Sequence, residues 1–549
     1  MAQSNRASVA ISQAPPGGQQ ARAAAPSEHS DVSQYRWLIL AGLITAAIME
    51  VLDTTIVNVA LPQMAGNLGA TFQEIAWVST GYILSNVVVL PMTAFLTQTF
   101  GRRNYLTASI IIFIVSSFFC GTSHTLVELV FWRVMQGAGG AALLSTAQAT
   151  LRQIFPREQQ GMVQAVFLLG VIVAPTLGPT LGGWITDNYT WNWCFFINVP
   201  IGLVSIFLVT TFLHDPPGMQ RRTGPVDLLG IGLLAVGLAC LQYVLEQGQE
   251  KDWFNDPLIV RLAILSSVCL ALMLWWELSP RNKAPVVDFR VLKNRDLSSA
   301  LFLFVSLGFG LYGGIYLFPL FAQNLLGFSP TTTGLLLLPG GIGTAISALI
   351  CGRILNGPRA LIDPRLLILF GVCIFSLSMW QLGHLTTSAG EPDVRLALIL
   401  RGFGLGFLFT PINNAAYGNI DPRIAQQASG LINLSRQLGG SFGIAILGTY
   451  LTNQTQFHRV ALISHIYRGN PLLESRLQGL TSNFMAHGYA HDTAQRAALS
   501  AVERVMMRQA TILAYNDAWM MILIVFLCTA PAILLLRKPR VKAAPAEAH

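Results

Sequence analysis

Charged residues are scarce in this chain. Of its 549 residues, 53% are hydrophobic and only 11% are Asp, Glu, Lys or Arg. Soluble domains carry about 25% charged residues, so most of this chain must avoid water. The net charge of +8 would suggest nucleic-acid binding in a soluble protein, but here the basic residues fall in short links between apolar runs. We therefore expect membrane lipid around the chain and no nucleic-acid partner.

Several chemical motifs are also missing. The sequence has no GxxxxGK[ST] phosphate loop, which argues against an ATP-driven pump. The seven cysteines are dispersed without CxxC pairs, and the histidines lack metal-ligand spacing, so we expect no metal site. No cluster of nucleophile and base stands out, which disfavours an enzyme, and we assign no catalytic residue. The N-terminus shows no cleavable signal peptide.

Long apolar runs dominate what is present. A helix needs about 20 apolar residues to cross a bilayer, and many runs have roughly this length. They begin near Trp37, Ile75, Tyr105, Leu126, Gly161, Cys194, Val226, Leu258, Leu297, Thr333, Leu366, Val394, Ser429 and Asp517. We predict an all-α membrane protein with about fourteen transmembrane helices, an even number that puts both termini on one side.

Basic residues gather in alternate links between these runs. Arg102, Arg103, Arg221 and Arg222 lie in links on one side, whereas the opposite links, such as 62–74, contain no Lys or Arg. Cytoplasmic loops are enriched in Lys and Arg, so the first side is expected to be the cytoplasm. Both termini are then cytoplasmic.

The chain divides into five expected parts. Residues 1–34 are rich in Ala, Gln, Ser and Pro and are expected to be a disordered cytoplasmic tail. The other parts are a six-helix bundle over 35–215, two inserted helices within 216–280, a second six-helix bundle over 281–536 with a long external loop at 452–516, and a cytoplasmic tail at 537–549.

An internal repeat is faintly visible between the two bundles. Each has a helix entered from outside in which an arginine is followed by glycines, Arg133-Val134-Met135-Gln136-Gly137 in one and Arg401-Gly402-Phe403-Gly404 in the other. Repeats of this kind are common in transporters. Chance recurrence of a Gly-rich helix is the alternative.

Few ionisable residues lie within the apolar runs. A charge in a span costs at least about 2.5 kcal/mol, so each one is a functional candidate. Glu50 and Asp53 are three residues apart and share a helix face. Counted from the outer helix ends, Asp53 and Arg133 lie at similar depth, so they can pair. Such a pair fits antiport, in which a carboxylate near a cation exchanges a proton for substrate. A static ion pair that fixes helix packing is the alternative.

Glycines and prolines interrupt the fifth apolar run. Gly178 and Gly182 are four residues apart and allow close helix approach, while Pro175 and Pro179 bend the helix. A rocking bundle needs these features, although a static bundle also uses them.

Softer candidates for a substrate pocket lie in the second bundle. Aromatic and amide side chains interrupt two apolar runs there, although packing or lipid contact is the commoner role of an aromatic stripe. These candidates are Tyr312, Tyr316, Phe321, Gln323, Asn413 and Asn414.

Together these segments resemble the fourteen-span drug:proton antiporters of the major facilitator superfamily, of the EmrB/QacA type. The resemblance runs from about Trp37 to Arg537 and includes Leu52-Asp53-Thr54-Thr55-Ile56-Val57-Asn58 in the first span. Phe100-Gly101-Arg102-Arg103 is similar to the end of the family's loop motif, Arg133 to Gly140 to its span-four motif, and Gly170 to Gly183 to its antiporter motif.

The resemblance implies the major facilitator fold, with two six-helix bundles plus two inserted helices. It also implies substrate and proton exchange at Asp53, with Glu50 and Asn58 nearby, proton coupling at Arg133, and conformational control by Gly101 to Arg103, Gln136, Gly137 and the glycines and prolines of span five. Protons would be the coupling ion, with no other cofactor. One departure is that Gln98 and Thr99 stand where the loop motif normally carries an acid, which puts its charge lock between the halves in doubt.

The external loop resembles that of the EmrB branch, whose members work with a periplasmic membrane-fusion adaptor and an outer-membrane channel. This implies a Gram-negative inner membrane and a tripartite pump that exports lipophilic or amphipathic compounds. A uniporter or importer of a nutrient or metabolite is the runner-up, and a membrane sensor that binds ligand without transport is a third hypothesis. The sequence does not name the substrate, because multidrug pockets are mostly apolar surfaces.

Overall fold

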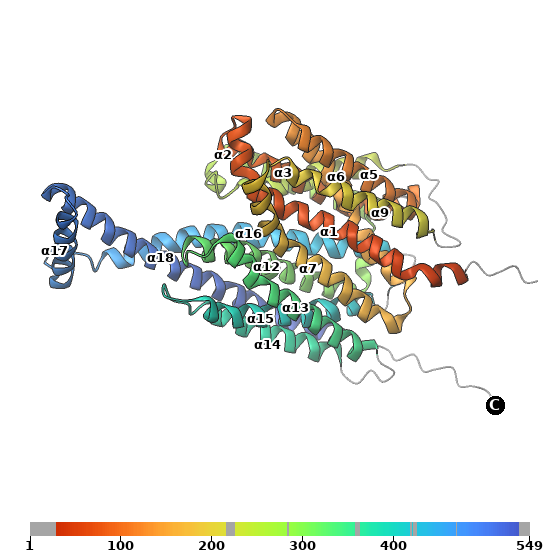
Figure 1. Ribbon diagram of the computed structural model, residues 1–549. Helices are drawn as coiled ribbons and strands as arrows, with labels where there is room; N and C mark the ends of the chain where they lie inside the picture. The colour runs from red at the N-terminus through yellow and green to blue at the C-terminus, as the bar shows by residue number, and fades with distance from the viewer. Residues whose placement is uncertain are drawn as a thin grey trace, which may run out of the picture.

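The structure is a computed structural model that describes residues 29–215, 226–282, 285–356, 363–417, 420, 425–467 and 469–536. Within these ranges every regular element is a helix. The long helices run roughly side by side in one bundle, and α17 with the first part of α18 projects from one end of it (Figure 1). The predicted all-α fold is confirmed.

The N-terminal half consists of the helices up to residue 212. They are α1 (His29–Leu68), α2 (Phe72–Ile75), α3 (Trp77–Val89), η1 (Leu90–Met92), α4 (Thr93–Phe100), α5 (Arg102–Thr122), α6 (Leu126–Ile154), α7 (Arg157–Asn188), α8 (Trp193–Phe196) and α9 (Asn198–Phe212). Helices α3, η1 and α4 follow one another without a loop, because Pro91 tightens one turn instead of ending the helix. They form a single span.

The inserted pair and the C-terminal half follow. They are α10 (Leu228–Gln247), η2 (Trp253–Asn255), α11 (Pro257–Leu278), η3 (Phe289–Lys293), α12 (Arg295–Asn324), α13 (Pro330–Asn356), α14 (Pro364–Leu382), α15 (Glu391–Tyr417), α16 (Ala425–Ile463), α17 (Pro471–Ala486), α18 (His491–Thr529) and η5 (Ala530–Leu535). The predicted domain boundaries between the halves and the inserted pair stay predictions, since parts of those links lie outside the described residues.

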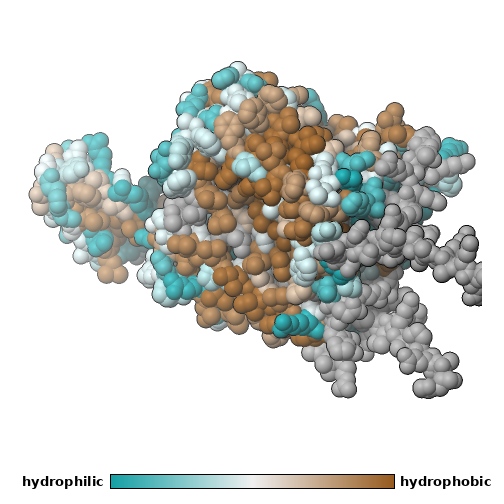
Figure 2. Space-filling model, turned by 45° about the vertical axis from the view of Figure 1, so that its right-hand side comes forward, coloured by the Kyte–Doolittle hydropathy of each residue, from teal (hydrophilic) through white to brown (hydrophobic). Residues whose placement is uncertain are grey.

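Within the described ranges, eleven helical segments are long and apolar enough to cross a membrane. Helices α6, α7 and α16, with 29, 32 and 39 residues, are also long and pack in the same bundle. A span count of fourteen stays a prediction. Hydrophobic side chains cover much of the visible middle of the bundle (Figure 2). The exposed hydrophobic side chains of the protein include Phe207 and Trp275, with 63% and 65% of their surface exposed. Such a surface requires lipid, so the chain is a multi-pass membrane protein.

Helices α7 and α16 pack across the two halves. Helix α7 packs along α13, and α16 packs against α4, η1 and α6. The inserted helix α10 packs against both α3 and α16, so it bridges the seam between the halves. On the α10–α11 connection, Trp253 donates from its indole nitrogen to Thr449 of α16 at 2.8 Å.

The helix bounds correct one prediction about the chain ends and refine another. Helix α1 begins at His29, so residues 29–34 of the predicted disordered tail are helical; residues 1–28 and 537–549 lie outside the described ones. The apolar run predicted to begin near Asp517 is the second part of a continuous 39-residue helix that begins at His491. The composition of the external segment 452–516, rich in Leu, Ala, Gln and Arg, predicts surface or amphipathic helices, and the segment is mostly helical.

Candidate functional site

Asp53 and Arg133 form a buried ion pair between α1 and α6. Arg133 Nη1 donates to Asp53 Oδ2 at 2.6 Å. The Arg133 side chain is 1% exposed and the Asp53 side chain is 0% exposed. The depth count from the sequence therefore pairs the correct residues. Two charges this deeply buried need further hydrogen bonds to offset their desolvation.

Neighbouring side chains supply those hydrogen bonds. Gln136 accepts from Arg133 Nη1 at 2.8 Å and donates to Asp53 Oδ1 at 3.0 Å, while the Arg133 Nε donates to the Val78 carbonyl at 2.9 Å. Asn198 of α9 donates to Asp53 Oδ1 at 2.8 Å. The Tyr82 ring lies 4.4 Å from the Arg133 guanidinium. The hydrogen-bonded network around the carboxylate and the guanidinium thus joins four helices, α1, α3, α6 and α9.

Asn198 and Tyr82 were not among the predicted site residues. Asn198 lies at the start of α9, in the run Phe196-Ile197-Asn198. A buried amide at the start of an apolar helix is the signal that could have identified it, because a buried polar side chain needs a partner. Asn198 also donates to Ser117 at 3.0 Å, which ties α5 to the same network.

Glu50 lies one turn from Asp53 but has different partners. Its Oε2 accepts from the backbone N–H of Leu144 at 3.1 Å, and its Oε1 accepts from Asn86 at 3.4 Å. Three charged or titratable groups interact electrostatically with Glu50. They are Asp53 on the same helix, Tyr82 on α3 and Arg436 on α16. Glu50 therefore couples α1 electrostatically to a helix of the other half.

Asn58 does not join this network. Its side chain is exposed and its Oδ1 accepts from Ser79 at 2.7 Å. Asn58 lies five residues beyond Asp53, so on an α-helix the two side chains point in directions about 140° apart.

Uncharged side chains join the two halves near the end of the bundle opposite α17. The Ser429 hydroxyl of α16 donates to the Ser145 carbonyl of α6 at 2.9 Å, and Asn433 donates to Gln148 at 3.1 Å. Gln426 donates to the Thr146 hydroxyl at 3.5 Å. We call these six residues the α6–α16 gate. Arg436 extends it, because its Nη2 donates to Asn433 Oδ1 at 2.9 Å.

The predicted conformational glycines lie at close helix contacts. A Cβ on Gly178 of α7 would overlap the Thr55 hydroxyl of α1, and one on Gly182 would lie 2.9 Å from the Ile56 carbonyl. A Cβ on Gly137 would overlap the Tyr82 carbonyl. The α1–α7 and α3–α6 contacts thus need the absence of a side chain at these three positions. The side chains of Pro175 and Pro179 lie outside the described residues.

The loop after the second span turns on Gly101. Its φ is +86° with ψ 151°, a conformation that only glycine adopts readily, and it separates α4 from α5. Arg102 is buried and donates to Gln153 of α6, while the backbone N–H of Arg103 donates to Asp215 at 2.9 Å. Thr99 is one of the two residues that stand where the loop motif normally carries an acid. Its hydroxyl donates to the Phe95 carbonyl of its own helix at 2.9 Å. These contacts lie within the N-terminal half.

The predicted pocket residues of the C-terminal half have diverse surroundings. Tyr312 and Tyr316 are half-buried and pack near Gly440 and Gly448 of α16. Phe321 is fully buried, with its ring 5.4 Å from that of Tyr515, so it belongs to the core. The remaining three candidates are Gln323, half-buried, Asn413, buried, and Asn414, half-buried.

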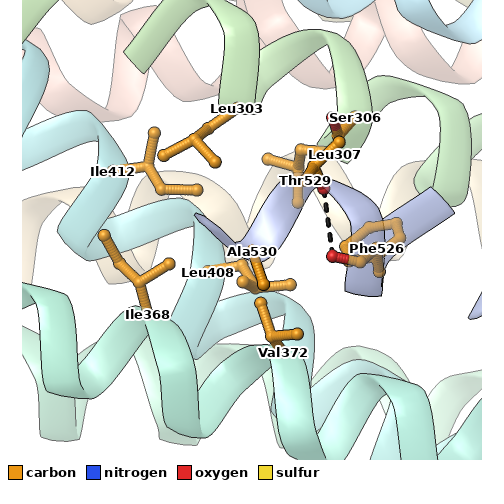
Figure 3. A pocket seen from close by; sticks show the side chains of 10 residues that line it. All are labelled: Leu303, Ser306, Leu307, Ile368, Val372, Leu408, Ile412, Phe526, Thr529 and Ala530. Atoms are coloured by element: carbon orange, nitrogen blue, oxygen red, sulfur yellow. Dashed lines mark hydrogen bonds between the residues drawn. The ribbon is translucent and has the colours of Figure 1, made fainter. Parts of the chain in front are cut away.

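A small pocket lies elsewhere in the same half, among α12, α14, α15 and the end of α18 (Figure 3). Apolar side chains such as Leu303, Ile368 and Ile412 point into it. Its free volume of about 10 Å³ holds about one water molecule. It is too small for a drug-sized ligand. Among the described residues no group of three or more metal-binding side chains occurs.

Taken together, a lipid-facing bundle in two packed halves and a hydrogen-bonded ion pair deep inside one half describe a membrane transport protein. The family model of the Major Facilitator Superfamily matches residues 43–444. The chain belongs to this superfamily, and its relatives place it in the EmrB type.

The relatives agree over most of the chain. Multidrug export protein EmrB of Haemophilus influenzae is 35% identical over 80% of this chain and 85% of its own length. Fatty acid resistance protein FarB of Neisseria gonorrhoeae is 31% identical over 92% of this chain and 96% of its own length. The crystal structure of the human organic anion transporter MFSD10 (TETRAN) matches with a TM-score of 0.54 at 12% identity, covering 91% and 99% of the two chains, and supports the fold alone.

Proposed function

We propose that this protein is a proton-driven exporter of lipophilic or amphipathic small molecules. Its similarity to a multidrug export protein and a fatty acid resistance protein supports multidrug efflux. The observation that carries proton coupling is the Asp53–Arg133 pair, because a fully buried carboxylate in a transporter is a candidate for reversible protonation.

In the first step, a proton binds Asp53. The neutral acid holds Arg133 and the amides of Gln136 and Asn198 less tightly, since hydrogen bonds to a charged group are about twice as strong. When the proton leaves, the carboxylate again attracts Arg133 or a cationic substrate. Proton and substrate thus exclude each other, which is the requirement for antiport.

Glu50 provides a route from the proton site to the gate. It accepts from the N–H of Leu144, and the next residue, Ser145, accepts from Ser429 across the halves. Protonation of Glu50 weakens both its bond to α6 and its attraction to Arg436, which bonds the gate residue Asn433. The α6–α16 gate then opens more readily.

We assign the gate end to the cytoplasm of a Gram-negative inner membrane, with both termini there. Links such as 62–74 at the α17 end contain no Lys or Arg, which supports this orientation. The described conformation is then closed toward the cytoplasm.

The projecting part formed by the ends of α16 and α18 with α17 is the proposed contact surface for a periplasmic adaptor, itself joined to an outer-membrane channel. Large apolar side chains are exposed on this projection, which favours a protein partner. They include Phe457 at 65%, Val460 at 66%, Leu472 at 81% and Val505 at 69% exposure.

Efflux of ethidium from energised cells tests the function. Cells that produce the protein in a host lacking its own efflux pumps are expected to expel ethidium, and a protonophore is expected to stop this. Asp53→Asn is the inactive control. Efflux that continues after the proton gradient is collapsed would contradict proton coupling and favour a uniporter.

A further inference from the structure

A second buried arginine, Arg401, occupies the matching place in the C-terminal half. It is 5% exposed on α15 and points toward α12. Its Nη2 donates to the Leu311 carbonyl at 3.3 Å and its Nη1 to the Gly314 carbonyl at 3.5 Å. Its Nε has no hydrogen-bond partner among the described residues.

Arg401 and Arg133 differ in the charge of the groups that they contact. Arg133 has a carboxylate at 2.6 Å and two further acceptors within 2.9 Å. Among the ion pairs of the described residues, none includes Arg401. The two carbonyls it contacts lie inside α12, where backbone N–H groups already use them. Five guanidinium donors therefore share two long contacts.

Such an arrangement is costly without an anion. An unpaired charge away from water is among the most unfavourable groups in a folded chain, and in a membrane span it marks a ligand or ion site. A deeply buried arginine thus occurs in each half, but only Arg133 is paired with an acid among the described residues. An anion from outside the chain can supply the missing charge.

A half-buried face of α12 borders Arg401. Along the outer part of this helix, half-buried side chains form a strip that includes Leu311, Tyr312, Ile315, Tyr316, Pro319 and Gln323. The Leu311 carbonyl, which accepts from Arg401, lies at the edge of this strip. The strip is mostly apolar and aromatic, which suits a hydrocarbon chain beside a charged head group.

We propose that Arg401 binds the carboxylate of an anionic single-chain amphiphile, whose hydrocarbon chain lies along this strip of α12. This deepens and rests on the proposed export function. The planar guanidinium fits a carboxylate through two parallel hydrogen bonds. Asp53 in the N-terminal half then serves the proton or a cationic compound, and Arg401 serves anionic ones.

Equilibrium binding to the purified full-length protein in phosphatidylcholine nanodiscs tests this. The probes are dodecanoate, the uncharged dodecanol and the cation ethidium. Arg401→Gln is expected to weaken dodecanoate binding about tenfold or more, because a hydrogen bond to a charged group is lost. Arg401→Lys is expected to fall between, since it keeps the charge without the fork. Dodecanol and ethidium binding are expected to stay within about twofold of wild type.

Arg395→Gln is the matched control, because this arginine lies on the same helix but is 55% exposed and paired with Glu391. It should leave all three affinities unchanged. Equal dodecanoate binding by wild type and Arg401→Gln overturns the proposal, as does an equal loss for all three probes.

A bilayer lipid is the other source of an anion. If phosphatidylglycerol in the nanodiscs abolishes the dependence of dodecanoate binding on Arg401, a lipid head group occupies the site and the substrate assignment is wrong. Binding is measured without transport, so loss of proton coupling in a flux assay would refute the export mechanism while leaving this site standing.

Discussion

Removing either charge of the Asp53–Arg133 pair should destabilise the protein strongly. Asp53→Asn leaves Arg133, 1% exposed, without its anion, and places an amide N–H group opposite other donors. Breaking a buried pair by removing one partner costs about 3–5 kcal/mol. Arg133→Gln should cost a similar amount, since Asp53 is then a buried carboxylate held only by Gln136 and Asn198.

The double variant separates stability from transport. With both charges gone, two neutral amides can hydrogen-bond to each other, so the loss should be smaller than the sum of the single losses by about 1–3 kcal/mol. Denaturant unfolding in detergent, followed by tryptophan fluorescence, measures the three free energies. Transport should stay absent in all three variants. Additive losses would refute the reasoning, because they would mean that the two side chains do not interact.

Three further predictions concern other parts of the fold. Gly178→Ala should cost about 1–3 kcal/mol by forcing α7 away from Thr55, whereas Gly183→Ala, which meets nothing within 4 Å, should be neutral in the same unfolding assay. Asn433→Ala removes the contacts to Gln148 and Arg436, so the α6–α16 gate should open about tenfold more often. Faster maleimide labelling of a cysteine placed at Thr146 measures this opening. An unchanged labelling rate would contradict the role assigned to the α6–α16 gate. Hydrogen bonds from the Thr71 backbone and side chain lower the pKa of Glu74. They therefore stabilise α2 at pH values above the ordinary carboxyl pKa, and this stabilisation is lost as the pH falls through the lowered pKa of Glu74. Amide exchange in α2 should accelerate as the pH falls through that range, and Glu74→Gln should abolish the pH dependence.

The fold and the central pair were predictable for simple reasons. A span has a fixed length and a fixed rise per residue, so the depth of Asp53 and Arg133 follows from counting. The cost of a buried charge then limits the candidates to a few positions. The family resemblance from Asp53 and the glycine motifs is confirmed by the matched family and relatives.

The rotation of each helix about its axis was not predictable. Helices that are apolar on all sides give no periodic signal for the face that meets a neighbour. Phe321 therefore lies in the core, and Asn58 bonds Ser79 instead of the central network. Asn198 was missed for the same reason, because its role depends on where α9 crosses α1. The length of α18 was hidden because its first part is polar and continues a helix beyond the membrane.

Proton movement driven by substrate tests the central claim most directly. In proteoliposomes containing a pH-sensitive dye, adding ethidium to the wild-type protein should evoke proton flux opposite in direction to ethidium, and the ratio of the two fluxes should stay constant as the gradient is varied. Asp53→Asn should show no proton flux. Ethidium transport by Asp53→Asn with a normal proton flux would contradict the account.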